Sequence, residues 1–75
     1  MKLKGWLNYP DMTISVHETG GKYRCSKYIG KASNRLNFKD CYCRLDLKYY
    51  LLSLANAPKK EITAMIGRLE QESTE

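Results

Sequence analysis

The first half of the chain alternates apolar and polar residues with a period of two. Met12, Ile14 and Val16 alternate with polar neighbours, which predicts a half-buried strand. The pair Gly20-Gly21 follows, and adjacent glycines supply the positive φ angles that a tight hairpin turn needs. Because β-favouring residues resume over Lys22 to Ile29, we expect a second strand that pairs with the first.

Two further segments extend this hairpin. Apolar and polar positions alternate again over residues 35–39, after a second turn signal at Gly30-Lys31. Residues 2–8 predict one more strand before the break at Pro10-Asp11, although Gly5 weakens regular structure there. The sequence therefore predicts an antiparallel sheet of three to four strands.

The apolar period changes after Asp40, a residue type that favours helix N-caps. Asp40 is the predicted N-cap of a helix over residues 41–55. The helix carries a wide apolar arc, which predicts contact with both the sheet and a second helix. The residues of this arc are Leu45, Leu47, Tyr49, Leu51, Leu52 and Leu54.

A second helix follows the stop and restart at Asn56-Ala57-Pro58, since proline is tolerated in the first turn of a helix. Its apolar stripe has the spacing of an amphipathic helix and consists of Ile62, Met65, Ile66 and Leu69. Its lysines lie at the start and its glutamates at the end, against the helix dipole, so we expect fraying after Gln71.

The 75 residues suffice for one domain, residues 1–75, because a chain splits into two cores only well above this length. The fold class is α+β, in the order β-β-β-β-α-α, with both helices packed on one face of the sheet. The other face is then left open to water, where a partner can reach it.

Charge is unevenly distributed along the chain, whose formal net charge is +5. Residues 1–44 carry six more basic than acidic side chains, so the attraction for anions belongs to the predicted sheet. The chain lacks a long apolar run and a signal-peptide pattern, so we expect no membrane span and a location in the cytoplasm. An odd number of cysteines fits reduced thiols there.

The sequence offers weak support for metal binding or catalysis. Cys25, Cys41, Cys43 and His17 together form a Cys₃His inventory that zinc accepts. However, Cys41 and Cys43 are spaced C-x-C rather than C-x₂-C, and His17 points away from the apolar side of its strand, so we expect free thiols and no metal. No orienting carboxylate accompanies the histidine and no phosphate-binding glycine motif is present. We therefore expect no enzyme activity and no cofactor.

The predicted strands place basic and aromatic residues together. If Leu36 and Phe38 face the helices, then Arg35, Asn37 and Lys39 point outward, and strand alternation groups Lys22, Arg24 and Tyr28 on one face. A cationic outer face with interleaved tyrosines suits nucleic acid, an acidic protein or merely solvent. Six tyrosines and one tryptophan favour an interface, because Trp, Tyr and Arg dominate binding energy.

Several local strings resemble the small phage-encoded anti-CRISPR proteins, in particular the inhibitors of type I-F surveillance complexes that bind the repeated backbone subunit. The most similar segment is the hairpin from Met12 to Gly20 with Lys22 after it. The parallel continues through the other matching positions, namely Met1-Lys2, Trp6, Gly30-Lys31, Phe38, Leu45, Tyr49-Tyr50 and the Ile-rich last helix.

This resemblance implies a four-stranded sheet with two helices, no catalysis, and inhibition by occupying the surface along which target DNA pairs with the guide. It places contact positions at Trp6 and His17, where the family has tyrosines, and at Tyr28, where it has glutamate. Together with strand alternation, this gives a predicted partner-binding set of Trp6, His17, Lys22, Arg24, Tyr28 and Arg35.

The leading hypothesis is thus a non-enzymatic phage anti-CRISPR protein that binds a Cas protein of a surveillance complex in the cytoplasm of the infected bacterial host. A relative aimed at another Cas subunit or CRISPR subtype also fits the pattern. The main alternative is a small basic nucleic-acid-binding module, such as a phage regulator, that uses the exposed sheet face directly. A third is a homo-oligomer whose edge strands pair.

Overall fold

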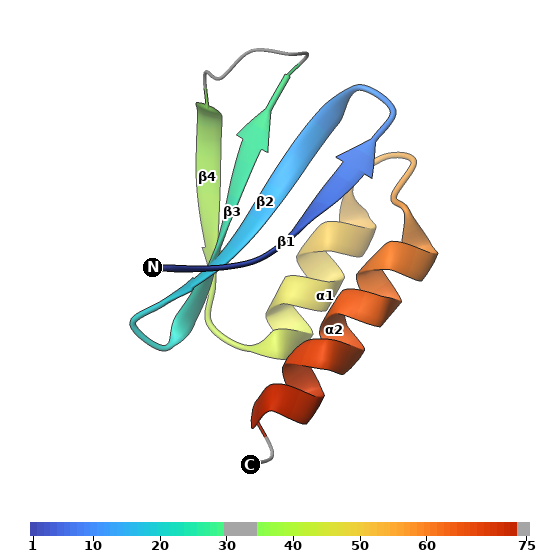
Figure 1. Cartoon of the computed structure of the whole chain (residues 1–75). Coiled ribbons are helices and arrows are strands. Elements are labelled where there is room, and N and C mark those ends of the chain that lie inside the picture. The colour runs from blue at the N-terminus through green and yellow to red at the C-terminus, as the bar shows by residue number, and fades with distance from the viewer. Residues whose placement is uncertain (30–34, 74–75) are drawn as a thin grey trace.

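A computed structural model describes residues 1–29 and 35–73 of the chain, with the side chains of 35–37 and 73 outside the description. The turn predicted at Gly30-Lys31 also lies outside the described residues. The elements are β1 (Lys2–Tyr9), β2 (Met12–Thr19), β3 (Lys22–Tyr28), β4 (Arg35–Cys41), α1 (Arg44–Ser53) and α2 (Lys59–Ser73), as Figure 1 shows. This order confirms the predicted β-β-β-β-α-α arrangement.

The four strands form one antiparallel meander in the order β1-β2-β3-β4. Pro10 and Asp11 make the turn between β1 and β2, where the sequence predicts a break. The turn between β2 and β3 is Gly20-Gly21, with φ angles of 56° and 81°. Both angles lie in the left-handed region that glycine adopts without steric cost, so this pair fixes the register of the hairpin.

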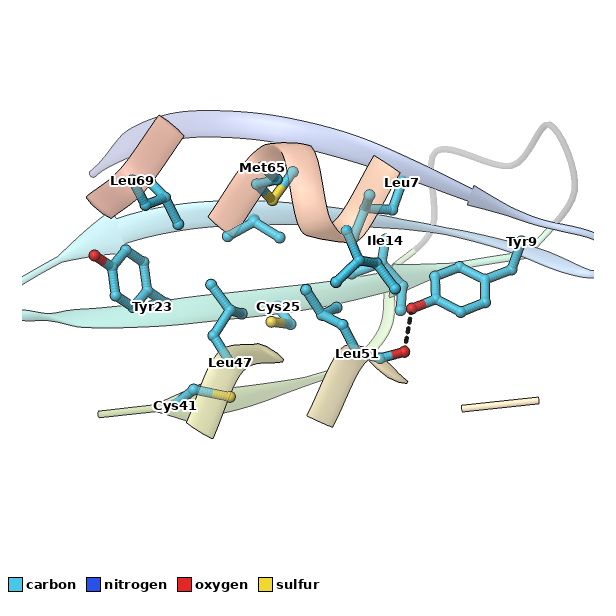
Figure 2. Close-up of a cluster of buried hydrophobic side chains, with 12 residues drawn as sticks. Leu7, Tyr9, Ile14, Tyr23, Cys25, Cys41, Leu47, Leu51, Met65 and Leu69 are labelled. Carbon is cyan, nitrogen blue, oxygen red and sulfur yellow. Dashed lines mark hydrogen bonds between the residues drawn. The ribbon is translucent and has the colours of Figure 1, made fainter. Parts of the chain in front are cut away.

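Both helices pack against the same face of the sheet and close a single core (Figures 1 and 2). The strands contribute alternate residues to this core, and the helices cover it with one stripe each. The buried hydrophobic residues are Leu7, Tyr9, Ile14, Val16, Tyr23, Cys25, Cys41, Leu47, Leu51, Ile62, Met65 and Leu69.

The second helix lies close to β1. A Cβ added to Gly5 would come within 2.7 Å of the terminal methyl of Met65, so the missing side chain of Gly5 lets α2 approach the sheet. Near the C-terminal end of α2, a carboxylate oxygen of Glu72 lies 2.7 Å from the Lys4 ammonium. The sequence predicts fraying after Gln71, whereas α2 continues to Ser73 and Glu72 takes part in this ion pair.

The first helix begins later than the sequence predicts. Its N-cap is Cys43, whose sulfur accepts a hydrogen bond from the backbone N–H of Asp46 at 3.4 Å. The prediction of Asp40 as N-cap is wrong, because Asp40 belongs to β4 and its carboxylate binds Lys22 and Arg24. The helix therefore covers Arg44–Ser53 rather than 41–55.

The apolar arc of α1 is only partly used in the core. Leu47 and Leu51 are fully buried, whereas Leu45 and Tyr49 are 56% and 62% exposed. A helix that packs on a sheet beside one neighbouring helix can bury only part of its circumference, so one side of the arc remains in water. None of the described helices is long and apolar enough to cross a membrane.

Candidate functional site: the open face of the sheet

The helices cover one face of the sheet, and we call the other the open face. Residues directly opposite each other in antiparallel strands point to the same side, so the strand register defines this face. Its described side chains are Leu3, Trp6, Asn8, Thr13, Ser15, His17, Thr19, Lys22, Arg24, Ser26, Tyr28, Phe38 and Asp40.

One row of four residues crosses the middle of the open face. Trp6 lies opposite Ser15, Ser15 opposite Ser26, and Ser26 opposite Phe38. The outer two are large and exposed, Trp6 to 53% and Phe38 to 45%, whereas the two serines between them are buried. The row therefore presents one aromatic side chain at each end and two small residues between them.

Trp6 and Tyr28 lean toward each other above the sheet. Their ring centroids lie 5.8 Å apart and their planes are inclined at 46°. Trp6 belongs to β1 and Tyr28 to β3, so the whole width of β2 separates their backbones. Neighbouring strands are about 4.8 Å apart, so the two rings can approach this closely only by reaching across β2. Ser15, the register partner of Trp6, lies on β2 between these two strands and is 0% exposed.

The other end of the open face carries a cluster of charges around Asp40. Arg24 donates to Asp40 from Nε at 2.9 Å and from Nη2 at 3.3 Å, and the Lys22 ammonium donates to the same carboxylate at 3.0 Å. The guanidinium carbon of Arg24 also lies 4.1 Å from the ring centroid of Phe38. Arg24 is thus held between a carboxylate and an aromatic ring, which fixes its orientation.

These hydrogen bonds change the pKa values of Asp40 and Arg24. Hydrogen bonds from Arg24 and then Lys22 lower the pKa of Asp40 to about 2. The hydrogen bond to Asp40 raises the pKa of Arg24 above its ordinary value. Asp40 and Arg24 therefore both remain ionised at neutral pH.

The open face is less cationic than the sequence predicts, because Phe38 and Lys39 of β4 lie on the sides opposite to those predicted. We call the choice of which alternate residues face the helices the phase of the strand. Phe38 was expected to face the helices, yet it lies opposite Ser26 on the open face. Lys39 was expected to point outward, yet it lies opposite the buried Cys25, with its ammonium 5.7 Å from the ring of Tyr50 in α1. The buried side chain of Cys41 sets this phase, since alternation from it sends Asp40 and Phe38 outward.

The structure brings most of the predicted binding residues together. Trp6, His17, Lys22, Arg24 and Tyr28 all lie on the open face. Arg35 lies opposite Tyr28 in the register, and its side chain is outside the described residues. Sequence reasoning missed Phe38 and Asp40. The sequence gives no signal for them, because their outward orientation follows from the burial of Cys41, which is seen only in the folded chain.

The thiols and the histidine are distributed over both sides of the sheet. Cys25 and Cys41 are buried in the core, and Cys43 is exposed at the start of α1. Burial raises the pKa of the Cys25 thiol well above its ordinary value, which disfavours the reactive thiolate. His17 lies on the open face, opposite Leu3 and Arg24. Among the described residues, no group of three His, Cys, Asp or Glu side chains is placed to hold a metal ion.

Comparison with protein-family models, curated proteins and solved structures gives no match to this chain.

Proposed function

We propose that this protein is a non-enzymatic inhibitor that binds another protein through the open face. The observation that carries the proposal is the exposure of Trp6 and Phe38, two large rings on a sheet face that no helix covers. Tryptophan, tyrosine and arginine are the residue types that most often anchor interfaces, and the open face holds Trp6, Tyr28 and an Arg24 fixed in orientation.

The charge of the open face favours a protein over a nucleic acid. Lys22 and Arg24 share the single carboxylate of Asp40, so part of their charge is already neutralised. Lys27 and Lys39 lie on the helix side, opposite Ile14 and Cys25. Nucleic-acid affinity comes mainly from cations that neutralise phosphates, and the described side chains of this face leave few of them unpaired.

The resemblance to the small phage-encoded anti-CRISPR proteins supplies the identity of the proposed partner. The positions that it implies as contacts, Trp6, His17 and Tyr28, are on the open face. We propose that the partner is a Cas protein of a type I surveillance complex, met in the cytoplasm of the infected bacterial host. Occupation of its surface then prevents target DNA from pairing with the guide.

The test measures binding of the purified protein to a reconstituted type I-F surveillance complex, together with the melting temperature of each variant. Trp6→Ala and Phe38→Ala should each weaken binding by about 30-fold or more, as expected of interface anchors, with little change in melting temperature. Tyr49→Ala is the control, because Tyr49 is also a largely exposed ring but lies on α1, away from the open face.

A parallel titration with duplex DNA at several salt concentrations examines the alternative function. Tight binding to DNA, with a log–log slope of about −0.9 for each phosphate contacted, would support a nucleic-acid-binding module. If Trp6→Ala and Phe38→Ala also bind the surveillance complex as well as the unmodified protein, the proposed function is wrong.

A further inference from the structure

The side chain of Ser15 places a buried hydroxyl on the open face. Its oxygen is buried and has no hydrogen-bond partner in the part of the chain that the structure describes. Ser15 alternates with the core residues Ile14 and Val16, so its side chain points to the open face rather than into the core. A buried hydroxyl without a partner destabilises the folded state, because it has lost its hydrogen bonds to water.

The aromatic pair Trp6–Tyr28 reaches across β2, the strand that carries Ser15. Trp6 is the register partner of Ser15, and its ring centroid lies 5.8 Å from that of Tyr28. Trp6 is 53% exposed, so an outward movement of its ring would break few packing contacts. Separation of the two rings would return the Ser15 hydroxyl to the surface at the centre of the open face.

The charged groups of the open face offer more hydrogen-bond donors than acceptors. The indole N–H of Trp6 is a donor, and the Arg24 guanidinium has N–H groups beyond the two that Asp40 accepts. Asp40, the carboxylate of this face, is already bound by two cations. The described charges of the face are two cations and one carboxylate, which leaves an excess of positive charge.

The geometry points to Ser15 as a hydrogen-bonding residue for the partner protein. When the complex forms, the rings of Trp6 and Tyr28 separate, and the Ser15 hydroxyl donates to a carbonyl or carboxylate oxygen that the partner inserts between them. Excess donors and positive charge select an acceptor oxygen. This inference rests on the proposed function, since it requires the open face to be the surface that binds.

Ser15→Ala tests the inference, because it removes only the hydroxyl oxygen. In the free protein the variant should melt at the same temperature as the unmodified chain or higher, since an unsatisfied group is lost. Its affinity for the reconstituted surveillance complex should fall by about 5–10-fold, the effect of one neutral hydrogen bond. Binding is thus expected to weaken without any loss of stability.

Ser53→Ala is the matched control. The Ser53 hydroxyl already donates to the carbonyl of Tyr50 at 2.7 Å, on α1 and away from the open face. This variant should lose some stability and keep its full affinity. Fluorine NMR of the protein with a fluorinated tryptophan at position 6 follows the ring directly, because Trp6 is the one tryptophan of the chain. Its resonance should shift when the complex forms, as the ring moves away from Tyr28.

The outcomes separate this inference from the proposed function. If Trp6→Ala weakens binding and Ser15→Ala does not, the open face binds the partner and the role of Ser15 is wrong. A lower melting temperature for Ser15→Ala would show that the hydroxyl already stabilises the free protein, which also overturns the inference. If neither variant affects binding, the proposed function itself falls.

Discussion

The hydroxyl of Tyr9 donates a hydrogen bond to the backbone carbonyl of Leu51 over 2.6 Å, as Figure 2 shows. Leu51 lies in the last turn of α1, where carbonyls have no partner within the helix. The bond therefore satisfies a buried acceptor and joins the end of β1 to the end of α1. Burial raises the pKa of Tyr9 to about 12, so this donor stays protonated through the physiological range.

Tyr9→Phe should lower the free energy of unfolding by about 1 kcal/mol, because the variant keeps the ring in the core but leaves the Leu51 carbonyl unpaired. Denaturant titration measures this as a shift of the midpoint at constant slope. Tyr49→Phe is the control, since Tyr49 is 62% exposed and its loss of a hydroxyl should change nothing measurable. Equal stability of both variants would show that the Tyr9 bond contributes nothing.

Leu51→Ala should destabilise the protein by about 2–5 kcal/mol, the range for removing a fully buried leucine side chain. Leu45→Ala, which deletes the same atoms from the same helix, should change stability by no more than about 0.5 kcal/mol because Leu45 is 56% exposed. Thermal or denaturant unfolding of the two variants side by side gives the comparison. Similar losses at both positions would mean that Leu45 packs in the core.

The order of elements could be predicted because each signal is local. Alternation over Met12 to Val16 and the two glycines that follow specify a hairpin, and Pro58 separates two helical patterns. The buried side of α1 could not be predicted. Leu45 and Leu47 are equally apolar, and only the position of the sheet and α2 decides which of them is covered.

The open face could be predicted on β2 and β3 and not on β4. Over residues 35–39 the apolar residues occupy even positions, whereas the buried Cys41 occupies an odd position. Because side chains alternate along a strand, the two patterns predict opposite phases for β4. The ion pairs of Asp40 with Lys22 and Arg24 hold β4 in the second phase, and such pairs form only once β3 and β4 lie side by side. The sequence also places Asp40 before a helical pattern, where an acidic residue more often caps the helix.

The Asp40 cluster should make stability depend on pH in the acid range. The folded pKa of Asp40 is about 2, below the value of about 4 for an unfolded aspartate. A lowered folded pKa contributes stability that is present above the unfolded pKa and is lost as the pH falls through the folded one. We therefore expect the free energy of unfolding to decrease between pH 4 and pH 2.

Asp40→Asn should flatten this decrease, since the amide does not titrate. Some slope will remain, because the hydrogen bond from Lys4 also lowers the pKa of Glu72. Denaturant titrations at several pH values, on the unmodified protein and on the variant, give both slopes. An identical acid dependence for the two proteins would contradict the role assigned to the Asp40 cluster.

The phase of β4 leads to the sharpest prediction for binding. Phe38 and Lys39 are neighbours in one strand, yet the register places Phe38 on the open face and Lys39 on the side of the helices. The alternation read from the sequence assigns them the other way round.

Phe38→Ala should therefore weaken binding to the surveillance complex by about 2 kcal/mol or more, because it also removes the ring on which Arg24 rests. Lys39→Ala should leave the affinity within about 0.5 kcal/mol of the unmodified protein, since surface changes away from a contact have small effects. Affinity measurements on the two variants at low and high salt decide between the phases. If Lys39→Ala weakens binding, most strongly at low salt, while Phe38→Ala does not, then the cations of the helix side carry the contact and the open face is not the binding surface.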